Sequence, residues 1–443
     1  MKSVAQGHSA VAALAGLVAA LVLSSAAGAV PRPKFVVKTL SPLAGQVVKK
    51  KVKWEVSVVG GRPNRVEFAI DGVLKWTDLR APYAFKGDRG YLDSATLAPG
   101  RHTLRATAFE GSGDSRKRNS LVSIVVQAPA SGIYWGAYME GKATYGSGYE
   151  AAPWDDNTWE LFESHAGKRV SIVHWGTSLP PWQREFNVFL STFRKVLARG
   201  DLSLVDMSSA TVPLRDIAAG KYDGALTTWV RQAKAWGHPF FLRWDAEMNG
   251  SWNAWGTTPS NFNSAVDYVN AWQHFHDIAT KVGATNITWV WCPNIDPFKT
   301  KTPYTQLYPG DAYVDWTCLD GYNFGGTDWM TFSQLFRPSY QEVLRLAPGK
   351  PIMIAEIGSA ENGGSKAGWI TDALAQLPSN FPRIQALVWF NVRIYQNGSW
   401  WSWQIESSGS AQTAFANGIA RPHYRPGGGF GKLPILSKIA PPS

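Results

Sequence analysis

Cysteine is scarce in this sequence: Cys292 and Cys318 are the only two among 443 residues. A fold that depends on a disulfide framework is therefore excluded, and the chain must rely on hydrophobic cores. A single bridge between the two cysteines stays open. The predicted strands place them at opposite ends of neighbouring parallel strands, which works against the short Cα separation that a bridge requires.

Long hydrophobic runs are also missing beyond the N-terminus, where no stretch reaches the ~20 apolar residues of a membrane-spanning helix. The N-terminus itself is typical of an export signal, with Lys2 before an apolar run from Val11 to Leu23, and with Ala27-Gly28-Ala29 before Val30. We therefore predict a signal peptide over residues 1–29. The protein is expected to be secreted, extracellular and without a membrane segment.

A continuous basic stripe is absent, although the formal net charge is +11. Apart from Lys49-Lys50-Lys51 and Arg116-Lys117-Arg118, the basic residues are scattered, which argues against nucleic-acid binding. An anionic cell wall or biofilm is a better partner for such a protein. The eight histidines include no pair at helical metal-ligand spacing, so neither a metal site nor a cofactor is expected. We expect a monomer.

Tryptophan, in contrast, is abundant, with 22 residues. A flat indole face packs on the C–H face of a pyranose ring as it does on other apolar surfaces. Many of these side chains belong to hydrophobic cores. So many of them in one exported chain nevertheless favour a carbohydrate ligand.

Residues 30–128 alternate between apolar and polar side chains with a period of two, as β-strands do. The alternating segments are Val52–Val58, Arg65–Ile70, His102–Ala108 and Leu121–Val126. Glycine-containing turns separate them, so this part is predicted to be an all-β sandwich. Its Ala69-Ile70-Asp71-Gly72 hairpin and its Leu97–His102 turn resemble bacterial immunoglobulin-like modules of secreted enzymes. A spacer role and weak cell-wall or glycan contact both fit such a module.

After a linker at residues 129–132, apolar strands alternate with helical segments over residues 133–421. The predicted strands are Ile133–Met139, Arg169–Gly176, Leu202–Ser208, Phe240–Asn249, Ile287–Asn294, Leu319–Phe324, Ile352–Gly358 and Ala386–Val392. Eight such strands separated by helices indicate a closed parallel (β/α)8 TIM barrel, which makes the protein multidomain. Residues 422–443 form a Gly/Pro-rich C-terminal tail that either wraps the barrel or is disordered.

Acidic residues near the C-terminal ends of the predicted strands are the first place to search for an active site. They are Glu140, Asp206, Asp245, Glu247 and Glu356. Retaining hydrolysis of a glycosidic bond needs two carboxyl groups about 5–5.5 Å apart. Glu247 and Glu356 are 109 residues apart. At roughly 33 residues for each strand–helix unit, this separation spans three units and matches strands 4 and 7.

The segments around these two glutamates resemble glycoside hydrolase family 26. Arg243-Trp244-Asp245-Ala246-Glu247-Met248-Asn249-Gly250 is similar to the acid/base strand of that family, and Ile354-Ala355-Glu356-Ile357-Gly358 is similar to its nucleophile strand. Trp289–Asn294 and Asp320–Asn323 resemble the strands between them. The resemblance covers about residues 133–405. It implies that Glu247 is the general acid/base, that Glu356 is the nucleophile, and that the substrate is a β-1,4-linked mannan.

One position departs from the family, whose mannanases usually have His immediately before the acid/base glutamate. This chain has Ala246, whose side chain can donate no hydrogen bond. Either Asp245 or Arg243 takes over the contact, or the substrate differs from mannan. Mixed-linkage β-glucan and xylan are the alternative substrates, and a catalytically silent glycan-binding wall protein is the alternative class.

Further side chains are candidates for substrate binding because they lie near strand ends or beside the glutamates. They are Arg243, Asp245, Asn249, Trp252, Trp255, His174, Trp175, Trp291, Tyr322 and Trp389. Trp175, Trp291 and Trp389 serve either as sugar platforms or as core. His174 is either a sugar hydrogen-bond donor or a structural histidine. Tyr322 is expected to donate to Glu356, while Trp244, Trp252 and Trp255 are expected to give Glu247 an apolar environment that keeps it protonated.

Overall fold

The structure is a computed structural model that describes residues 35–48, 51–86, 90–94, 97, 100–111, 116–126, 132–176, 180–396 and 398–442. The predicted signal peptide and nearly all of the predicted linker lie outside these ranges. Among the described residues, no helix combines the length and the apolar character that crossing a bilayer requires.

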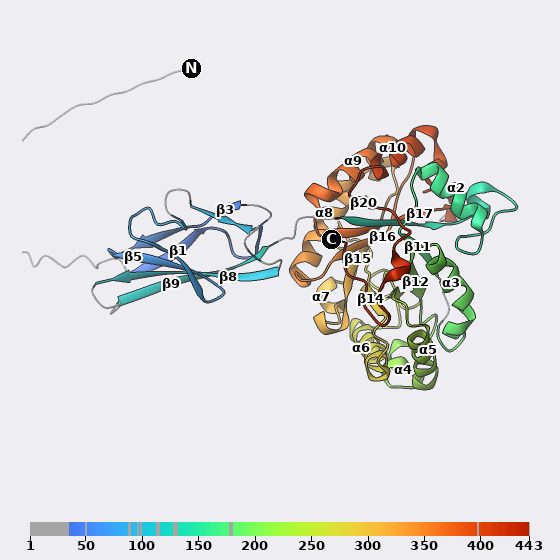
Figure 1. The fold of residues 1–443 in the computed structure, drawn as a ribbon, viewed down its shortest axis with the longest axis horizontal. Coiled ribbons are helices and arrows are strands. Elements are labelled where there is room, and N and C mark those ends of the chain that lie inside the picture. The colour runs from blue at the N-terminus through green and yellow to red at the C-terminus, as the bar shows by residue number, and fades with distance from the viewer. Residues whose placement is uncertain are drawn as a thin grey trace, which may run out of the picture.

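Residues 35–126 form an all-β domain, called here the N-terminal β domain, as the alternation predicted (Figure 1). Its strands are β1 (Val36–Ser41), β2 (Gln46–Val48), β3 (Lys51–Lys53), β4 (Glu55–Val59), β5 (Arg65–Ile70), β6 (Val73–Asp78), β7 (Tyr91–Asp93), β8 (Gly100–Glu110) and β9 (Arg116–Val126). They form one five-stranded sheet in the order β2-β9-β8-β5-β6 and the pairs β1-β4 and β3-β7. Trp54 packs against Phe68 and Phe85 in its core. Asp71 and Gly72 both have positive φ, which suits the two-residue turn between β5 and β6.

The second domain is a closed parallel barrel, again as predicted. Its strands are β10 (Ile133–Met139), β11 (Ile172–Gly176), β12 (Leu202–Met207), β13 (Phe240–Trp244), β14 (Ile287–Trp291), β15 (Trp316–Asn323), β16 (Ile352–Ser359) and β17 (Ile384–Asn391). Consecutive strands pair from β11 to β17. The barrel closes because β10 pairs with both β17 and β11.

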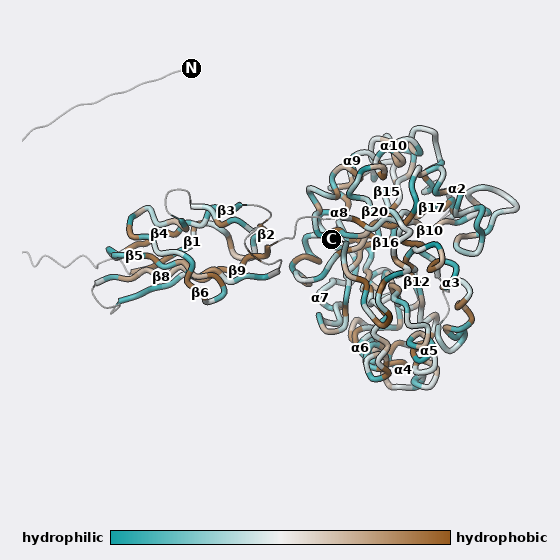
Figure 2. The backbone as a smooth tube through the Cα atoms, in the orientation of Figure 1, coloured by the Kyte–Doolittle hydropathy of each residue, from teal (hydrophilic) through white to brown (hydrophobic). Residues whose placement is uncertain are grey.

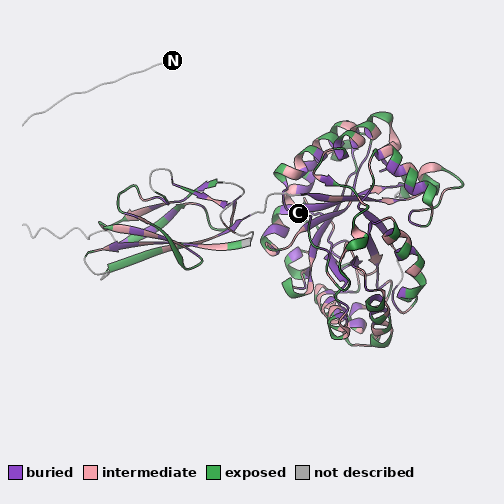
Figure 3. Ribbon diagram, viewed as in Figure 1, coloured by how far each residue is buried: buried purple, intermediate pink, exposed green. Residues whose placement is uncertain are grey.

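Helices surround this barrel, and the buried strands occupy the centre of the domain (Figures 1 and 3). The helices are α1 (Lys142–Tyr145), α2 (Asp156–Ala166), α3 (Leu190–Ala198), α4 (Leu214–Ala218), α5 (Asp223–Trp236), α6 (Ala265–Val282), α7 (Tyr304–Leu307), α8 (Phe332–Leu346), α9 (Lys366–Asn380) and α10 (Gly409–Ile419). A short hairpin, β18 (Arg393–Gln396) and β19 (Ser399–Ser402), follows the last barrel strand. Apolar residues concentrate along the strands in both domains (Figure 2), as burial of a common core requires.

The fourth barrel strand is much shorter than predicted. The sequence indicated a strand from Phe240 to Asn249, but β13 ends at Trp244. Asp245 and Glu247 have φ values of 44° and 56°. Few residues other than glycine adopt this left-handed region, and a residue in it cannot continue a strand. The chain therefore turns across the top of the barrel where the predicted acid/base residue stands.

The C-terminal tail wraps the barrel. A short strand, β20 (Tyr424–Arg425), pairs with the start of β10. Further on, Ile439 is buried in the barrel interior, where its N–H donates to Thr288 Oγ1 at 2.9 Å and its carbonyl accepts from Trp316 Nε1 at 2.9 Å. The tail thus closes the bottom of the barrel, at the ends of the strands opposite to the predicted active site.

Cys292 and Cys318 form a disulfide, with their Cα atoms 4.3 Å apart. The prediction that they stand at opposite ends of neighbouring strands is wrong. The strands β14 and β15 are staggered, so that Val290 pairs with Trp316 and Trp291 with Thr317. Continuing this register brings the two cysteines side by side.

Candidate active site

The inward-facing side chains of the barrel form two layers near the C-terminal ends of its strands. Ile172, Leu204, Phe241 and Cys318 belong to an apolar layer in the barrel interior. Two residues further along the same strands stand His174, Asp206, Arg243 and Asp320. Because alternate strand residues face the same side, these polar groups also point inward. They form a polar floor at the face where (β/α)8 barrels carry their active sites.

Arg243 is the centre of this polar floor. Its Nε and Nη2 atoms donate to the two oxygens of Asp206 at 2.6 and 2.5 Å, and its Nη1 donates to Asp320 Oδ2 at 2.6 Å. Nη2 also donates to Glu356 Oε1. His174 Nε2 lies 2.9 Å from Asp206 Oδ2. One buried guanidinium thus orients three carboxyl groups, a use for which the planar fork of arginine is well suited.

The acids of this floor differ in their protonation behaviour. Burial alone would raise the pKa of Asp206, but the charges of Arg243 and His174 outweigh it and hold that pKa below its usual range. Burial raises the pKa of Asp320 well above its usual range, and the neighbouring carboxyl groups act in the same direction, against Arg243. Arg243 donates two hydrogen bonds to Asp206, the acid of this floor whose charged form it stabilises.

A β-bulge in β16 directs Glu356 toward the cavity. Leu319 pairs with Ile354, but the next residue of β15 pairs with Glu356, so Ala355 is the extra residue. A bulge of this kind re-aims side chains beside active sites. The two oxygens of Glu356 accept hydrogen bonds, one from Arg243 and the other from the hydroxyl of Tyr322, the contact expected from the sequence.

Glu247 is held from the opposite side of the cavity. Its N–H donates to the carbonyl of Cys292 at 2.8 Å, which anchors the left-handed backbone. Its carboxyl oxygens accept from Trp252 Nε1 at 2.6 Å and from Asn294 Nδ2 at 2.5 Å. Burial, reinforced by the negative charge of Glu356, raises the pKa of Glu247 to about 7. The hydrogen bond from Trp252 lowers this pKa, so the predicted apolar role of that indole needs correction.

The two glutamates lie close to each other. Carboxyl oxygens of Glu247, Asp320 and Glu356 all lie within 4.8 Å of one another. The cavity above them has a volume of about 160 Å³, and Asp206, Arg243, Ala246, Asn253 and Trp255 also line it. The arrangement brings one carboxyl group with a raised pKa next to a second one held by a cation. Such a pair can combine proton transfer with nucleophilic attack.

Trp255 lines this cavity, and Trp252 lies beside it through its hydrogen bond to Glu247. Trp252 is 51% exposed, and the Nζ atom of Lys301 lies 5.8 Å from its ring centroid. Trp255 lines the cavity and donates from Nε1 to the carbonyl of Ala246 at 2.7 Å. Both remain candidates for contact with a sugar.

Trp175, Trp291 and Trp389 are core residues, and their predicted role as sugar platforms is corrected. All three are buried between the barrel strands and the helices. Trp175 packs edge-on against Phe193, and Trp389 packs edge-on against Phe415. The reason lies in strand alternation: each faces the side opposite to its inward-facing neighbours on the strand.

Asp245 and Asn249 support the site without lining the cavity. Asp245 is buried, its Oδ1 accepts from Ser209 N at 2.6 Å, and burial raises its pKa to about 7. Asn249 is also buried and exchanges two hydrogen bonds with the backbone of Asn294, at 2.8 and 2.9 Å. Both are fully buried and neither lines the cavity, which argues against their prediction as substrate-binding residues. Glu140 accepts from Ala143 N and so caps α1.

The sequence analysis did not single out Asp320 or Asn294 as functional residues. Asp320 precedes Tyr322 by two positions and therefore faces the same side of β15. Strand alternation could thus have indicated from the sequence that Asp320 lies beside Tyr322 in the site. Asn294 lies beyond the end of β14, and its contact with Glu247 depends on the loop conformation. No periodicity could have indicated it.

The cluster of acids also raises the question of a metal. In the described part of the chain, two of the potential ligand groups are Glu247 with Asp320 and Glu356, and His174 with Asp206 and Glu356. Arg243 forms ion pairs with acids of both groups, so a cation already neutralises part of their charge. The third group contains the two bridged cysteines. These residues suit acid–base chemistry better than metal binding.

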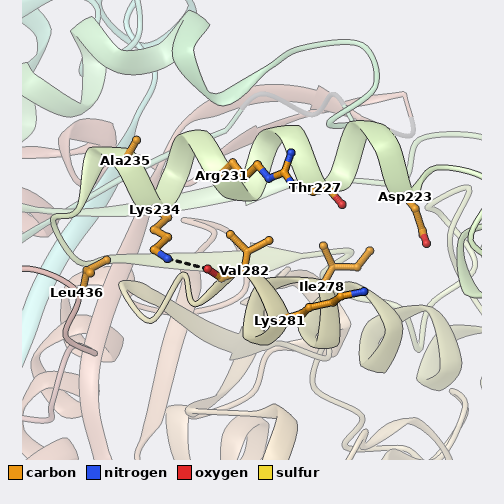
Figure 4. Close-up of a pocket in the computed structure, with 9 residues that line it drawn as sticks. All are labelled: Asp223, Thr227, Arg231, Lys234, Ala235, Ile278, Lys281, Val282 and Leu436. Carbon is orange, nitrogen blue, oxygen red and sulfur yellow. Dashed lines mark hydrogen bonds between the residues drawn. The ribbon is translucent and has the colours of Figure 1, made fainter.

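A larger hollow lies elsewhere, between α5 and α6 (Figure 4). It has a volume of about 800 Å³ and is lined by Asp223, Arg231, Lys234, Lys281 and others. Lys234 donates to the carbonyl of Val282 at 2.8 Å. This hollow contains a single acid and no arrangement of paired carboxyl groups, so we place the active site at the smaller cavity.

Comparison with known proteins agrees with this location. Residues 208–378 match the family model described as glycosyl hydrolase family 26. Over 314 residues, the chain is 32% identical to Endoglucanase H of Acetivibrio thermocellus, which covers 68% of this chain and 33% of that protein. Over 124 residues, it is 36% identical to a mannan endo-1,4-beta-mannosidase of Bacillus subtilis, covering 27% of this chain and 30% of that protein. The chain thus spans about a third of these curated relatives.

A solved structure shows the same fold. The Cellulomonas fimi endo-beta-1,4-mannanase double mutant matches with a TM-score of 0.52 at 18% identity, over 71% of this chain and 76% of that chain. The matched family segment contains Glu247 and Glu356, together with Arg243, Asp320 and Tyr322. Residues 208–378 are therefore the part of this chain that is similar to glycoside hydrolase family 26.

Proposed function

We propose that this protein is a retaining endo-β-1,4-glycosidase that cleaves a mannan-type polysaccharide, with Glu356 as nucleophile and Glu247 as general acid and base. The observation that carries this proposal is the approach of the two carboxyl groups, whose oxygens lie within 4.8 Å. Retaining enzymes hold their two carboxyl groups about 5–5.5 Å apart. Inverting enzymes need roughly 6.5–9.5 Å, because a water must fit between the group and the sugar.

The different surroundings of the two glutamates support the division of roles. Arg243 and Tyr322 both donate to Glu356, which orients it as a carboxylate. Glu247 has a pKa of about 7 and so holds its proton in mildly acidic solution. A carboxyl group that holds its proton, beside a second one that accepts hydrogen bonds from a guanidinium and a hydroxyl, is the basis for assigning acid and nucleophile here.

The reaction then runs in two steps. The Glu356 carboxylate attacks the anomeric carbon, while the bond to the glycosidic oxygen breaks and Glu247 gives its proton to that oxygen. A water then attacks the anomeric carbon of the glycosyl ester on Glu356. The water oxygen bonds to that carbon, the water proton passes to the Glu247 carboxylate, and the ester bond breaks to release the Glu356 carboxylate. Two displacements at one carbon leave its configuration unchanged.

The pH profile follows from the role of Glu247. Its proton is needed in the first step, so kcat/KM should fall about tenfold per pH unit as pH rises above about 7. In Trp252→Phe the carboxylate loses a donor, so its charged form is less stable and the basic limb should move up by about 1 pH unit. Trp76→Phe, in the N-terminal β domain, is the matched control and should leave the profile unchanged. A basic limb that stays in place or moves down in Trp252→Phe would contradict this role.

The substrate class rests on the names of the relatives, among which are a mannan endo-1,4-beta-mannosidase and an endo-beta-1,4-mannanase. A reducing-sugar assay on mannan, glucomannan, lichenan and xylan tests it. We expect release of new ends from mannan at the highest rate. Faster cleavage of lichenan or xylan would mean that mannan is not the preferred substrate, but would leave the proposed retaining mechanism in place. No cleavage of any polymer would point to a catalytically silent glycan-binding protein.

Ala246 gives a second test of the substrate, because it lines the cavity next to Glu247. The resemblance to family 26 mannanases implies a His, and therefore a hydrogen-bond donor, at this position. Ala246→His should therefore raise kcat/KM on mannan relative to lichenan, by about fivefold for one added hydrogen bond. The ratio is measured on both polymers with the same preparation, so that a general loss of activity cancels. An unchanged ratio would mean that the sugar does not contact this position.

We also propose that the N-terminal β domain is an immunoglobulin-like module. The five-stranded sheet, the smaller pairs β1-β4 and β3-β7, and the tight turn at Asp71-Gly72 support this assignment. Solving its structure in isolation and comparing strand order with immunoglobulin-like domains would test it. A different order of strands would refute it.

A further inference from the structure

The positive charge of this protein is not shared between its domains. Residues 30–128 contain 18 Lys and Arg against 8 Asp and Glu, a net charge of +10. Residues 129–443 contain 25 of each, so the barrel and tail are neutral. Residues 35–126, the N-terminal β domain, contain 16 Lys and Arg against 8 Asp and Glu, so most of the formal charge of +11 belongs to this domain. Such an excess attracts a polyanion and has no evident role in folding.

The described acids of this domain are already engaged. Five of them form salt bridges at 2.5 to 3.9 Å: Asp93 with Lys51, Glu55 with Lys53, Glu67 with Arg65, Asp71 with His102, and Glu110 with Arg116. Asp78 is buried and accepts from Ala84 N at 2.9 Å. Arg105, Lys117 and Arg118 are exposed and form no salt bridge with any described residue. These cations are available to a ligand.

These three cations meet at one place on the five-stranded sheet. They line a hollow of about 530 Å³ over β5, β6, β8 and β9, together with Glu67, Leu74 and other residues. Ala106 faces the core, so its neighbour Arg105 faces outward. The outer half of β9, which carries Lys117 and Arg118, is exposed (Figure 3). The one acid of the hollow, Glu67, is paired with Arg65.

The floor of the hollow adds apolar surface to the charge. Leu74 is 54% exposed, and Phe109 lies under the guanidinium of Arg65, 4.0 Å from its ring centroid. With Arg65 over Phe109, the described residues of the hollow offer no free aromatic face on which a nucleobase could stack. Cations beside aliphatic surface suit a sugar ring that carries a carboxylate. The acid-rich catalytic cavity, in contrast, disfavours an anionic chain.

We propose that the N-terminal β domain binds an acidic polysaccharide, a polymer of uronic acid residues, through the hollow lined by Arg105, Lys117 and Arg118. The ligand of this domain therefore differs from the polymer that the barrel cleaves. The protein is held on an anionic glycan while its neutral catalytic domain acts on a neutral one. The acidic ligand is inferred from the N-terminal β domain alone, whereas the contrast with a neutral polymer rests on the proposed function. Binding and cleavage are measured separately, so the two can fail independently.

The test is binding of the full-length protein to polygalacturonate, measured by affinity electrophoresis and calorimetry. Wild-type protein should bind polygalacturonate and should not bind the same polymer after full methyl esterification, which removes its charge. Affinity should fall as salt rises from about 50 mM to about 300 mM, since the contact is ionic. Failure to bind polygalacturonate at the lower salt would overturn the proposal.

A pair of triple variants locates the site. Arg105→Gln with Lys117→Gln and Arg118→Gln should weaken binding by about tenfold or more. The matched control removes three cations from the hollow of Figure 4, with Arg231→Gln, Lys234→Gln and Lys281→Gln, and should bind within about twofold of wild type. Both should cleave soluble oligosaccharide normally. Arg105→Gln alone, with an unchanged melting temperature, repeats the test where the triple variant is unstable.

Equal weakening in both triple variants would mean that net charge alone attracts the polymer, and would overturn the assigned site. The proposed acidic polysaccharide ligand would also be overturned if the protein bound duplex DNA or vesicles of anionic phospholipid as tightly as polygalacturonate at equal salt. Loss of binding confined to the β-domain variants, with polygalacturonate preferred over both competitors, is the expected result.

Discussion

Replacing Glu356 with alanine is expected to reduce turnover by roughly 10⁴-fold or more, because no glycosyl-enzyme forms without the nucleophile. The loss should appear in kcat on every substrate, including aryl glycosides with good leaving groups, since leaving-group quality cannot replace the attacking group. Azide added to this variant can occupy the empty space beside Arg243 and Tyr322. It should then give a glycosyl azide of inverted configuration, after a single displacement.

Glu160→Gln is the matched control for this variant, because Glu160 is an exposed acid on α2 whose side chain is 68% accessible. It should retain wild-type activity. Thermal unfolding of both variants shows whether loss of the buried carboxylate, which leaves Arg243 with one partner fewer, has disturbed the fold. More than about 1% residual activity in a folded, uncontaminated Glu356→Ala would be incompatible with its role as nucleophile.

Replacing Glu247 with alanine is expected to give a different pattern. Cleavage of polysaccharide should fall by about 10³-fold, because the leaving oxygen of a sugar needs protonation. An aryl glycoside with a good leaving group needs little protonation of its leaving oxygen. With such a substrate the variant should therefore form the glycosyl-enzyme rapidly and accumulate it. Azide, which requires no general base, should restore turnover and give a glycosyl azide of retained configuration.

The two azide products together assign the glutamates. If Glu247→Ala gave the inverted azide and Glu356→Ala the retained one, the roles would be reversed. Asn294→Ala is a useful companion, because it removes one donor to Glu247 and leaves the carboxyl group in place. It should move the basic limb of the pH profile upward and should not respond to azide.

The (β/α)8 barrel could be predicted from the sequence because eight apolar segments of strand length alternate with helical segments. The number of strands is enough to indicate a closed barrel. The sequence also predicted that Glu247 and Glu356 lie on strands 4 and 7. Glu356 does lie on the seventh strand, whereas Glu247 lies three residues after the end of the fourth. Alternation within a strand would also have separated cavity residues from core residues. His174 and Trp175 are adjacent, for example, and cannot both face the cavity. The indoles at the strand ends belong to the core for this reason.

Other parts of the site depend on departures from regular structure. The bulge at Ala355 and the left-handed backbone of Asp245 and Glu247 direct both glutamates into one cavity, and no periodicity indicates either feature. The disulfide depended on the stagger between β14 and β15, which the sequence does not show. Pairing of distant strand ends is set by barrel closure as a whole.

The configuration of the first product tests the central claim most directly. Proton NMR during the first minutes of hydrolysis of a β-1,4-linked manno-oligosaccharide separates the two anomers before mutarotation mixes them. The closely spaced pair of Glu247 and Glu356 predicts that the β-anomer appears first and that the α-anomer follows slowly. Initial appearance of the α-anomer would show a single displacement by water, and would contradict the assignment of Glu356 as a nucleophile.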